Sequence, residues 1–202
     1  MNDHPEGIRM KKRIAWAVLA PAVLLVSACG TKGGWMGAAA EKAYDKDKEA
    51  ARLAAVRNSD DYYEYQLDNE IIVLADKKDV KVYLTVGEIP LRVTKIAGGP
   101  KGERLVFGLV KNEAKAMEKK VGYKGGAQQM YEGTLDGNDK GFYGEVMKGG
   151  RYYVFGSWTD LKAFRQSGNA ASVATGTTSD GKSVTYTTDN PDVMARFKDL
   201  HG

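Results

Sequence analysis

A stretch in the middle of the chain has a counterpart near its end, and this internal repeat constrains the fold more than any other feature. Residues 70–83 align without a gap with residues 151–164, and coincident glycines and apolar positions continue beyond them. Identical pairs include Val73 with Val154, Asp79 with Asp160, Lys81 with Lys162, Gly87 with Gly168, and Thr94 with Thr175. Self-similarity of this kind indicates a repeated structural unit. We therefore expect two copies of one unit, at 61–122 and 141–202, joined by a connector at 123–140.

The alignment also decides the secondary structure of an ambiguous segment. Residues 80–86 alternate between apolar and polar as a half-buried strand does, but the partner segment 161–167 does not, whereas the apolar spacing of both fits a helix. Residues typical of helix ends flank both segments: Asp76 and Ser157 before them, Gly87 and Gly168 after them. We therefore predict a helix in each copy, although the β-branched residues of the first copy favour a strand.

Turn signals complete each unit, which is predicted as strand, strand, helix, strand, strand, helix. The glycines after Lys148 and the pair Asp180-Gly181 predict hairpin turns, and Asn190-Pro191 predicts the start of the last helix. A unit of about 60 residues buries little surface alone, so we expect the two to share a core or to pack face to face. The predicted fold is α+β: two tandem ββαββα-like repeats forming one pseudo-symmetric body, preceded by an Ala-rich helix at 41–58.

The start of the chain has the three regions of a secretion signal. The basic cluster Lys11-Lys12-Arg13 precedes an apolar run at 14–26, and small residues then lead into Cys29. A run of this length fits a signal peptide, for which roughly 7–15 residues are typical, and is shorter than the roughly 20 that span a bilayer. We expect residues 1–28 to be a signal peptide, with Met10 as an alternative start.

The segment Val26-Ser27-Ala28-Cys29 resembles the lipobox of bacterial lipoproteins. The resemblance implies cleavage before Cys29 and acyl chains such as palmitate on that residue, and it covers only the first 30 residues. Each buried methylene contributes about 0.8 kcal/mol, so two or three chains anchor a protein durably. Because the residue after the cysteine is Gly30 and not Asp, the resemblance implies an outer-membrane protein facing the periplasm. Residues 29–40 are expected to form a flexible tether. The alternative is a buried free cysteine in an ordinary secreted protein.

Composition excludes several kinds of chemistry. The chain has a single cysteine, and its two histidines are His4 in the leader and His201 at the end. No intramolecular disulfide can form, and a Cys-rich metal site is excluded. The formal charge is +4, of which the leader contributes two charges, so the mature part is too weakly basic to indicate nucleic-acid binding. We expect no cofactor, no metal and no catalytic residue, and only slight effects from changing His201.

Several motifs suggest sites that have simpler explanations. Asp136 to Gly141 begins like a calcium loop, but Lys140 and Met147 stand where that loop needs oxygen ligands, so a polar turn is expected. Asp76 with Asp79 could form an acid–base pair, yet helix capping accounts for both. Gly125-Gly126 lacks the context of a phosphate loop and is predicted to be a turn.

Aromatic residues around the second hairpin are the candidate binding residues. Tyr152, Tyr153 and Trp158 could stack on sugar rings or anchor a protein partner, or they could fill one face of a sheet. The sequence is therefore interpreted as an envelope lipoprotein that serves as a non-catalytic binding or scaffold module. Its partners would be the membrane, through Cys29, and an unknown envelope protein or glycan. The alternatives are an inhibitor or immunity protein against an envelope-targeting enzyme, and a carboxylate-based hydrolase of envelope glycans.

Overall fold

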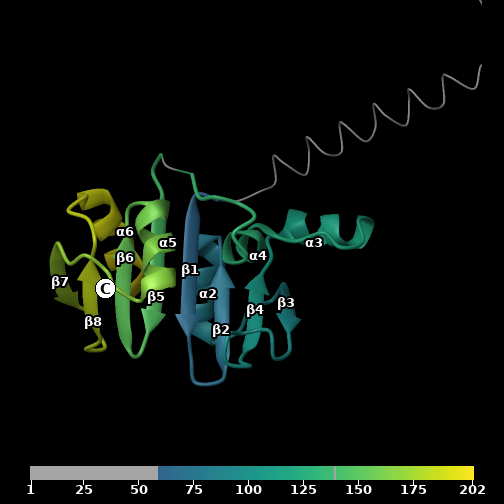
Figure 1. The fold of residues 1–202 in the computed structure, drawn as a ribbon, viewed down its shortest axis with the longest axis horizontal. Helices are drawn as coiled ribbons and strands as arrows, with labels where there is room; N and C mark the ends of the chain where they lie inside the picture. The colour runs from purple at the N-terminus through teal and green to yellow at the C-terminus, as the bar shows by residue number, and fades with distance from the viewer. Residues whose placement is uncertain (1–58, 139) are drawn as a thin grey trace, which may run out of the picture. The chain divides into compact units, whose positions relative to one another are not determined.

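One eight-stranded mixed sheet, with helices on both faces, makes up the described part of the chain (Figure 1). The computed structural model describes residues 59–138 and 140–202. The predicted signal peptide, tether and Ala-rich helix, together with Cys29, lie outside the described residues. The fold class is α+β, as predicted.

The strands appear in the sheet in the order β3-β4-β2-β1-β5-β6-β8-β7. Their bounds are β1 Asp61–Gln66, β2 Glu70–Leu74, β3 Arg92–Lys95, β4 Arg104–Gly108, β5 Tyr143–Lys148, β6 Arg151–Phe155, β7 Ala174–Thr177 and β8 Ser183–Tyr186. The helices are α2 Lys77–Val86, α3 Lys111–Lys119, α4 Gly126–Tyr131, α5 Trp158–Ser167 and α6 Pro191–His201.

The two halves of the chain meet at the centre of the sheet, where β1 and β5 run parallel. Outward from β1, β1 pairs antiparallel with β2, β2 pairs parallel with β4, and β4 pairs antiparallel with β3. Outward from β5 they follow the same sequence through β6, β8 and β7. The halves are thus joined edge to edge within one sheet, which corrects the alternative that they pack face to face.

The helices predicted from the alignment are present in both halves. The side chain of Asp76 accepts a hydrogen bond from the Lys78 amide at 2.7 Å, and Ser157 caps α5 in the same way. Gly87 and Gly168 end their helices with φ of 74° and 75°, a conformation that favours glycine. End signals and tertiary packing therefore outweigh the β-branched residues of α2.

The predicted hairpin turns are also confirmed, but the connector is not a simple loop. α4 lies within it and buries Ala127 and Met130 against the sheet. Gly126 is the first residue of this helix, and its amide donates to Glu113 at 2.6 Å, so Gly125-Gly126 is not an isolated turn. A side chain at Gly125 would place its Cβ 2.6 Å from Leu109, which explains a glycine there. Six residues are too few to show helical periodicity in the sequence.

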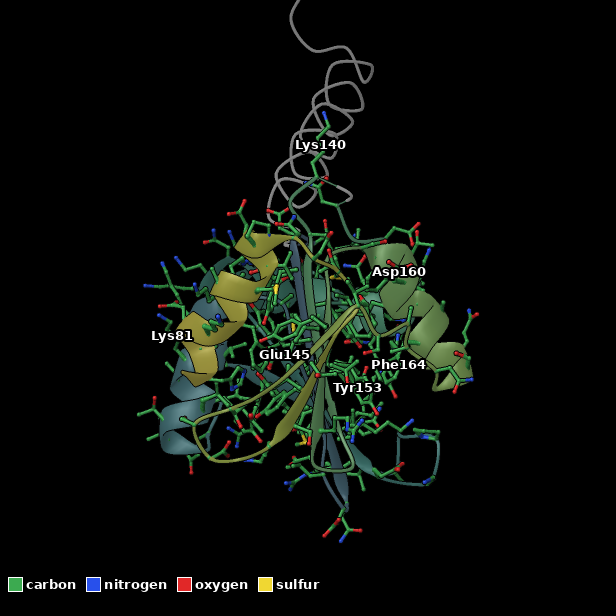
Figure 2. The ribbon with its side chains drawn as sticks, turned by 90° about the vertical axis from the view of Figure 1, so that its left-hand side faces the viewer. Lys81, Lys140, Glu145, Tyr153, Asp160 and Phe164 are labelled. Carbon is green, nitrogen blue, oxygen red and sulfur yellow. The ribbon has the colours of Figure 1, made fainter. Side chains whose placement is uncertain are left out.

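Each face of the sheet has its own core. The α4/α5 face, covered by those two helices, includes Phe107, Trp158 and Phe164, and the α2/α6 face includes Val80 and Phe197. Viewed along the sheet, Phe164 of α5 lies on one side and Lys81 of α2 on the other (Figure 2). Because β1 and β5 are parallel neighbours with the register Glu64 to Val146, aligned positions of the two halves point to opposite faces.

Candidate binding site

Each central strand carries a buried glutamate, Glu64 in β1 and Glu145 in β5. Their exposed fractions are 2% and 0%. Two positions earlier in each strand a tyrosine hydroxyl donates to the carboxylate, from Tyr62 at 2.5 Å and from Tyr143 at 2.8 Å. Burial and the neighbouring carboxylate raise the pKa of both tyrosines well above the ordinary value, so both hydroxyls remain donors.

Glu145, on the α2/α6 face, is closed off by protein. Besides Tyr143 it accepts a hydrogen bond from Tyr65 at 2.8 Å, and the His201 Nε2 lies 2.9 Å from it. The His201 ring is 4.5 Å from both Phe197 and Tyr152, centroid to centroid. Both oxygens of the Glu145 carboxylate are engaged and the network is almost completely buried, which is typical of a structural role.

Glu64, on the α4/α5 face, holds an arginine of α5 in place. The Nε of Arg165 lies 3.0 Å from the carboxylate, and Gln66 donates to it at 2.6 Å. The guanidinium also donates to the Tyr131 carbonyl at 3.1 Å and lies 4.4 Å from the centre of the Tyr131 ring. Burial lowers the pKa of Arg165, but nearby Tyr62 and Glu64 raise it more, so the charge is retained.

This ion pair lines a small cavity, which we call the Arg165 pocket. Its volume is about 200 Å³. The wall includes charged and polar groups from both halves of the sheet and from the β3–β4 loop: Glu64, Gln66, Lys101, Glu103, Lys148 and Arg165. Tyr131 and Phe164 supply aromatic surface. A cavity with a few convergent, fixed polar groups is the usual form of a binding site.

The Arg165 pocket adjoins a larger depression of about 680 Å³, which we call the hairpin groove. Gln66, Ile71, Lys101, Glu103 and Lys148 line both. The rest of the groove is lined by Leu67, Asp68, Met147, Gly149, Gly150 and Lys182. β1 ends here. The groove therefore lies at the opposite end of the central strands from residue 59, where the described chain begins.

The charges in the Arg165 pocket are unequal in number. Lys101, Lys148 and Arg165 face two carboxylates, Glu64 and Glu103. Glu103 accepts a hydrogen bond from the Lys101 amide at 2.7 Å, and backbone hydrogen bonds lower its pKa. Both carboxylates therefore already have donors, and the lysine ammonium groups are the less satisfied charges.

A second depression, of about 710 Å³, lies at the other end of the central strands, near the start of β1. Its lining is charged: Asp60, Asp61, Asp76, Lys77, Lys78, Lys81, Lys140 and Arg196, with Asn138 and Gly141. The carboxylates have structural partners, since Asp61 pairs with Arg196, Asp60 accepts from Asn138, and Asp76 caps α2. Its Asp61–Arg196 pair is also fixed, with side chains 13% and 29% exposed, but it has no counterpart of Glu64, which is 2% exposed, so it is the weaker candidate.

The aromatic residues predicted as binding residues do not form a surface. Tyr152 and Trp158 are 5% and 2% exposed and lie on opposite faces of the sheet. Tyr153 is half-buried, with its ring 4.5 Å from that of Phe164. The rings therefore do not form an exposed stacking patch and instead fill the sheet faces, which was the alternative: Tyr152 and Tyr153 alternate along β6 and point to opposite faces, and Trp158 is the first residue of α5.

The loop at Asp136 to Gly141 has a structural role where it is described. Asp136 accepts hydrogen bonds from the Trp158 indole at 2.8 Å and from Lys162 at 2.9 Å. No cluster of three or more potential metal-ligating side chains occurs within residues 59–138 and 140–202. Asp76 is a helix cap, and Asp79 stands in the first turn of the same helix.

His201 differs from its sequence-based expectation. Its side chain is only 6% exposed and belongs to the closed Glu145 network, and the His201 carbonyl accepts from the Ser179 amide at 3.4 Å. The position of His201 near the end of the sequence gave no indication that its side chain is buried. Glu64 and Arg165 were not predicted from the sequence, although a charged residue inside the aromatic stretch Tyr62-Tyr63-Glu64-Tyr65 is a signal for a buried, partnered carboxylate.

Among the described helices, none combines the length and the apolar character needed to cross a bilayer. Comparison of the chain with protein-family models, with curated proteins and with solved structures found no match.

Proposed function

We propose that the protein is a lipid-anchored component of the bacterial envelope that serves as a non-catalytic binding module. The anchor rests on the signal-like start of the chain and the lipobox resemblance at Cys29. Acylation there would hold the domain at the outer membrane, facing the periplasm, on the tether at 29–40. The ends of the central strands remote from residue 59, where the hairpin groove lies, would then be free to meet a partner.

The observation that carries the binding function is the fixed Arg165 guanidinium in a pocket that opens into a groove. Binding sites gain affinity when their polar groups are ordered beforehand, because less side-chain entropy is lost on association. Glu64, the Tyr131 carbonyl and the Tyr131 ring already order this arginine. The groove is large enough for a ligand of several residues.

The glycosidase alternative has one observation in its favour, because Glu64 and Glu103 line the same pocket. Such an enzyme needs one carboxylic acid that keeps its proton until it donates it to the leaving group. Backbone hydrogen bonds lower the pKa of Glu103, which opposes that role, and Glu64 already accepts from Tyr62, Gln66 and Arg165. Binding therefore accounts for the pocket better than hydrolysis does.

The anchor is tested by Cys29→Ser in the bacterial host. Labelling with a fatty-acid analogue should tag the wild-type protein and not the variant, which should accumulate as unprocessed precursor because the acylation site is lost. A Ser27→Thr variant, which keeps the cysteine, serves as the control and should still be labelled. Equal labelling of the Cys29→Ser variant would remove the lipoprotein assignment.

The binding function is tested in intact cells with a photo-reactive amino acid in place of Leu67 in the hairpin groove. The same amino acid in place of Val121, which is fully exposed and does not line the groove, is the control. A specific adduct at position 67 that weakens when Lys148 is changed to Gln would support a binding site in this groove. Identical adducts at both positions, or turnover of an envelope glycan lost with Glu103→Gln, would contradict the proposal.

A further inference from the structure

The geometry points to the terminal carboxylate of a peptide as the group that the Arg165 pocket binds, with the rest of the peptide in the hairpin groove. This inference rests on the binding function proposed above and gives that site a ligand class. It follows from three properties of the pocket: its remaining hydrogen-bond donors, its charge and its size.

Donors remain on Arg165 after its structural contacts are counted. A guanidinium has five N–H donors in a rigid plane, which suits the two oxygens of a carboxylate. The contacts with Glu64 and with the Tyr131 carbonyl use only part of them. The side chain keeps 21% of its surface exposed and lines the pocket, so the remaining donors can reach a ligand.

The charge of the pocket suits a ligand with a single negative charge. Three cations, Lys101, Lys148 and Arg165, face two carboxylates, which leaves an excess of one positive charge. A bound carboxylate would neutralise that excess. A doubly charged phosphate would leave an excess of negative charge beside Glu64, which is almost completely buried and cannot be hydrated.

The size of the two spaces suits a peptide end. A volume of about 200 Å³ is below the roughly 300–1,000 Å³ of most ligand pockets, so it admits one residue rather than a large ligand. The adjoining groove offers apolar contacts at Leu67, which is 41% exposed, and at half-buried Met147. Lys101 and Lys148 stand where the two spaces join. A peptide supplies both the terminal carboxylate and the apolar side chains for such a path.

The test uses the purified full chain in detergent micelles and two mixtures of randomised hexapeptides. One mixture has free C-terminal carboxylates, and the other is identical in sequence but has C-terminal amides. Retained peptides should come from the free-acid mixture, and amidation of a retained peptide should weaken its binding about tenfold or more, as expected for a lost charge-assisted bidentate contact. Oligosaccharides of glucuronic acid serve as a third probe.

Variants locate the binding. Lys148→Gln, at an exposed position, should weaken peptide binding several-fold without loss of folding, and Lys78→Gln in the opposite depression should leave it unchanged. Arg165→Lys keeps the charge but loses the planar guanidinium. It should weaken the binding of free-acid peptides more than the binding of amidated peptides.

Three outcomes would overturn the inference: equal binding of acids and amides, preference for glucuronic acid oligosaccharides, or no retained peptide. If the adduct at position 67 still forms in cells under any of these outcomes, the groove binds another class of ligand and the proposed binding function stands. If that adduct is also absent, the binding function fails as well.

Discussion

At the scale of single residues, the tyrosine–glutamate pairs explain how a carboxylate can occupy the middle of a β-strand. A buried charge costs several kcal/mol unless donors replace the lost water. Tyr62 and Tyr143 supply such donors from within the same strands, and Arg165 and Tyr65 supply them from other elements. The short-range donors are encoded in the sequence, and the long-range ones depend on the fold.

Removing Glu64 should be among the most destabilising single changes in the described domain. Glu64→Ala leaves the half-buried Arg165 without its buried counter-charge, and breaking a buried pair in this way costs about 3–5 kcal/mol. Urea unfolding followed by tryptophan fluorescence would measure the loss. Glu70→Ala is the matched control, because its partner Arg104 is 57% exposed and stays hydrated when the pair is broken, so the change should cost less than about 1 kcal/mol. Equal losses in both variants would show that Glu64 is not a structural charge.

His201→Ala should also lower the free energy of unfolding, contrary to the sequence-based expectation of a slight effect. The change removes the partner 2.9 Å from buried Glu145 and the ring contacts with Tyr152 and Phe197. A lost hydrogen bond to a charged group and lost packing together suggest about 2–3 kcal/mol. Lys198→Ala, at an exposed position of the same helix, should change stability by less than about 0.5 kcal/mol. A loss of stability no larger than that of this control would mean that His201 contributes only slightly, as the sequence predicted.

At the scale of elements, helix ends were more predictable than short buried helices. α2 and α5 have a capping residue before them and a glycine after them, and these local signals depend only on neighbouring backbone groups. α4 has neither a side-chain cap nor enough residues for periodicity, and its buried residues Gly126, Ala127, Gln128 and Met130 form no pattern that distinguishes them from a loop. Its place was therefore fixed by packing, which the sequence does not reveal.

The glycines that end α2 and α5 should make equal contributions. No atom lies within 4 Å of the position of a Cβ at Gly87 or Gly168, so substitution costs only the backbone strain at φ of 74° and 75°. Gly87→Ala and Gly168→Ala should each lower the free energy of unfolding by about 1 kcal/mol, and together by about 2 kcal/mol, since distant sites add. Thermal or urea unfolding of the single and double variants would test this. Gly176→Ala, where φ is not positive and the nearest atom is 3.6 Å away, is the control.

At the scale of the whole molecule, the sequence predicted the contents of each half but not how the halves join. The pairing of β1 with β5 is parallel, long-range and determined by both cores at once, and no local pattern specifies its register. The Arg165 pocket depends on that pairing, because Gln66 and Lys148 come from the two central strands and Arg165 from α5. The tandem repeat stays an interpretation of the sequence, for which the shared strand order offers a structural parallel.

The attachment of β3 to the connector should depend on pH through Glu132. This residue follows α4 and accepts hydrogen bonds from Lys95 of β3 at 2.7 Å, from Lys124 and from Gln128 at 2.9 Å. Partial burial alone would raise the pKa of Glu132, but these hydrogen bonds outweigh it and lower the pKa from 4.5 to about 2. The folded protein therefore binds this proton less readily than the unfolded chain does.

The stabilisation should be complete above pH 4.5 or so and should be lost as the pH falls towards about 2, because protonation of Glu132 then breaks the contacts. Glu132→Gln should lower the free energy of unfolding at neutral pH by about 1 kcal/mol, a figure reduced for solvent screening at the exposed lysines. Urea unfolding of both proteins from neutral pH downwards should show the difference between them closing within that window. Glu118→Gln, on the exposed surface of α3, should show no such difference. A constant difference between wild type and Glu132→Gln at every pH would mean that the contribution of Glu132 is packing and not charge.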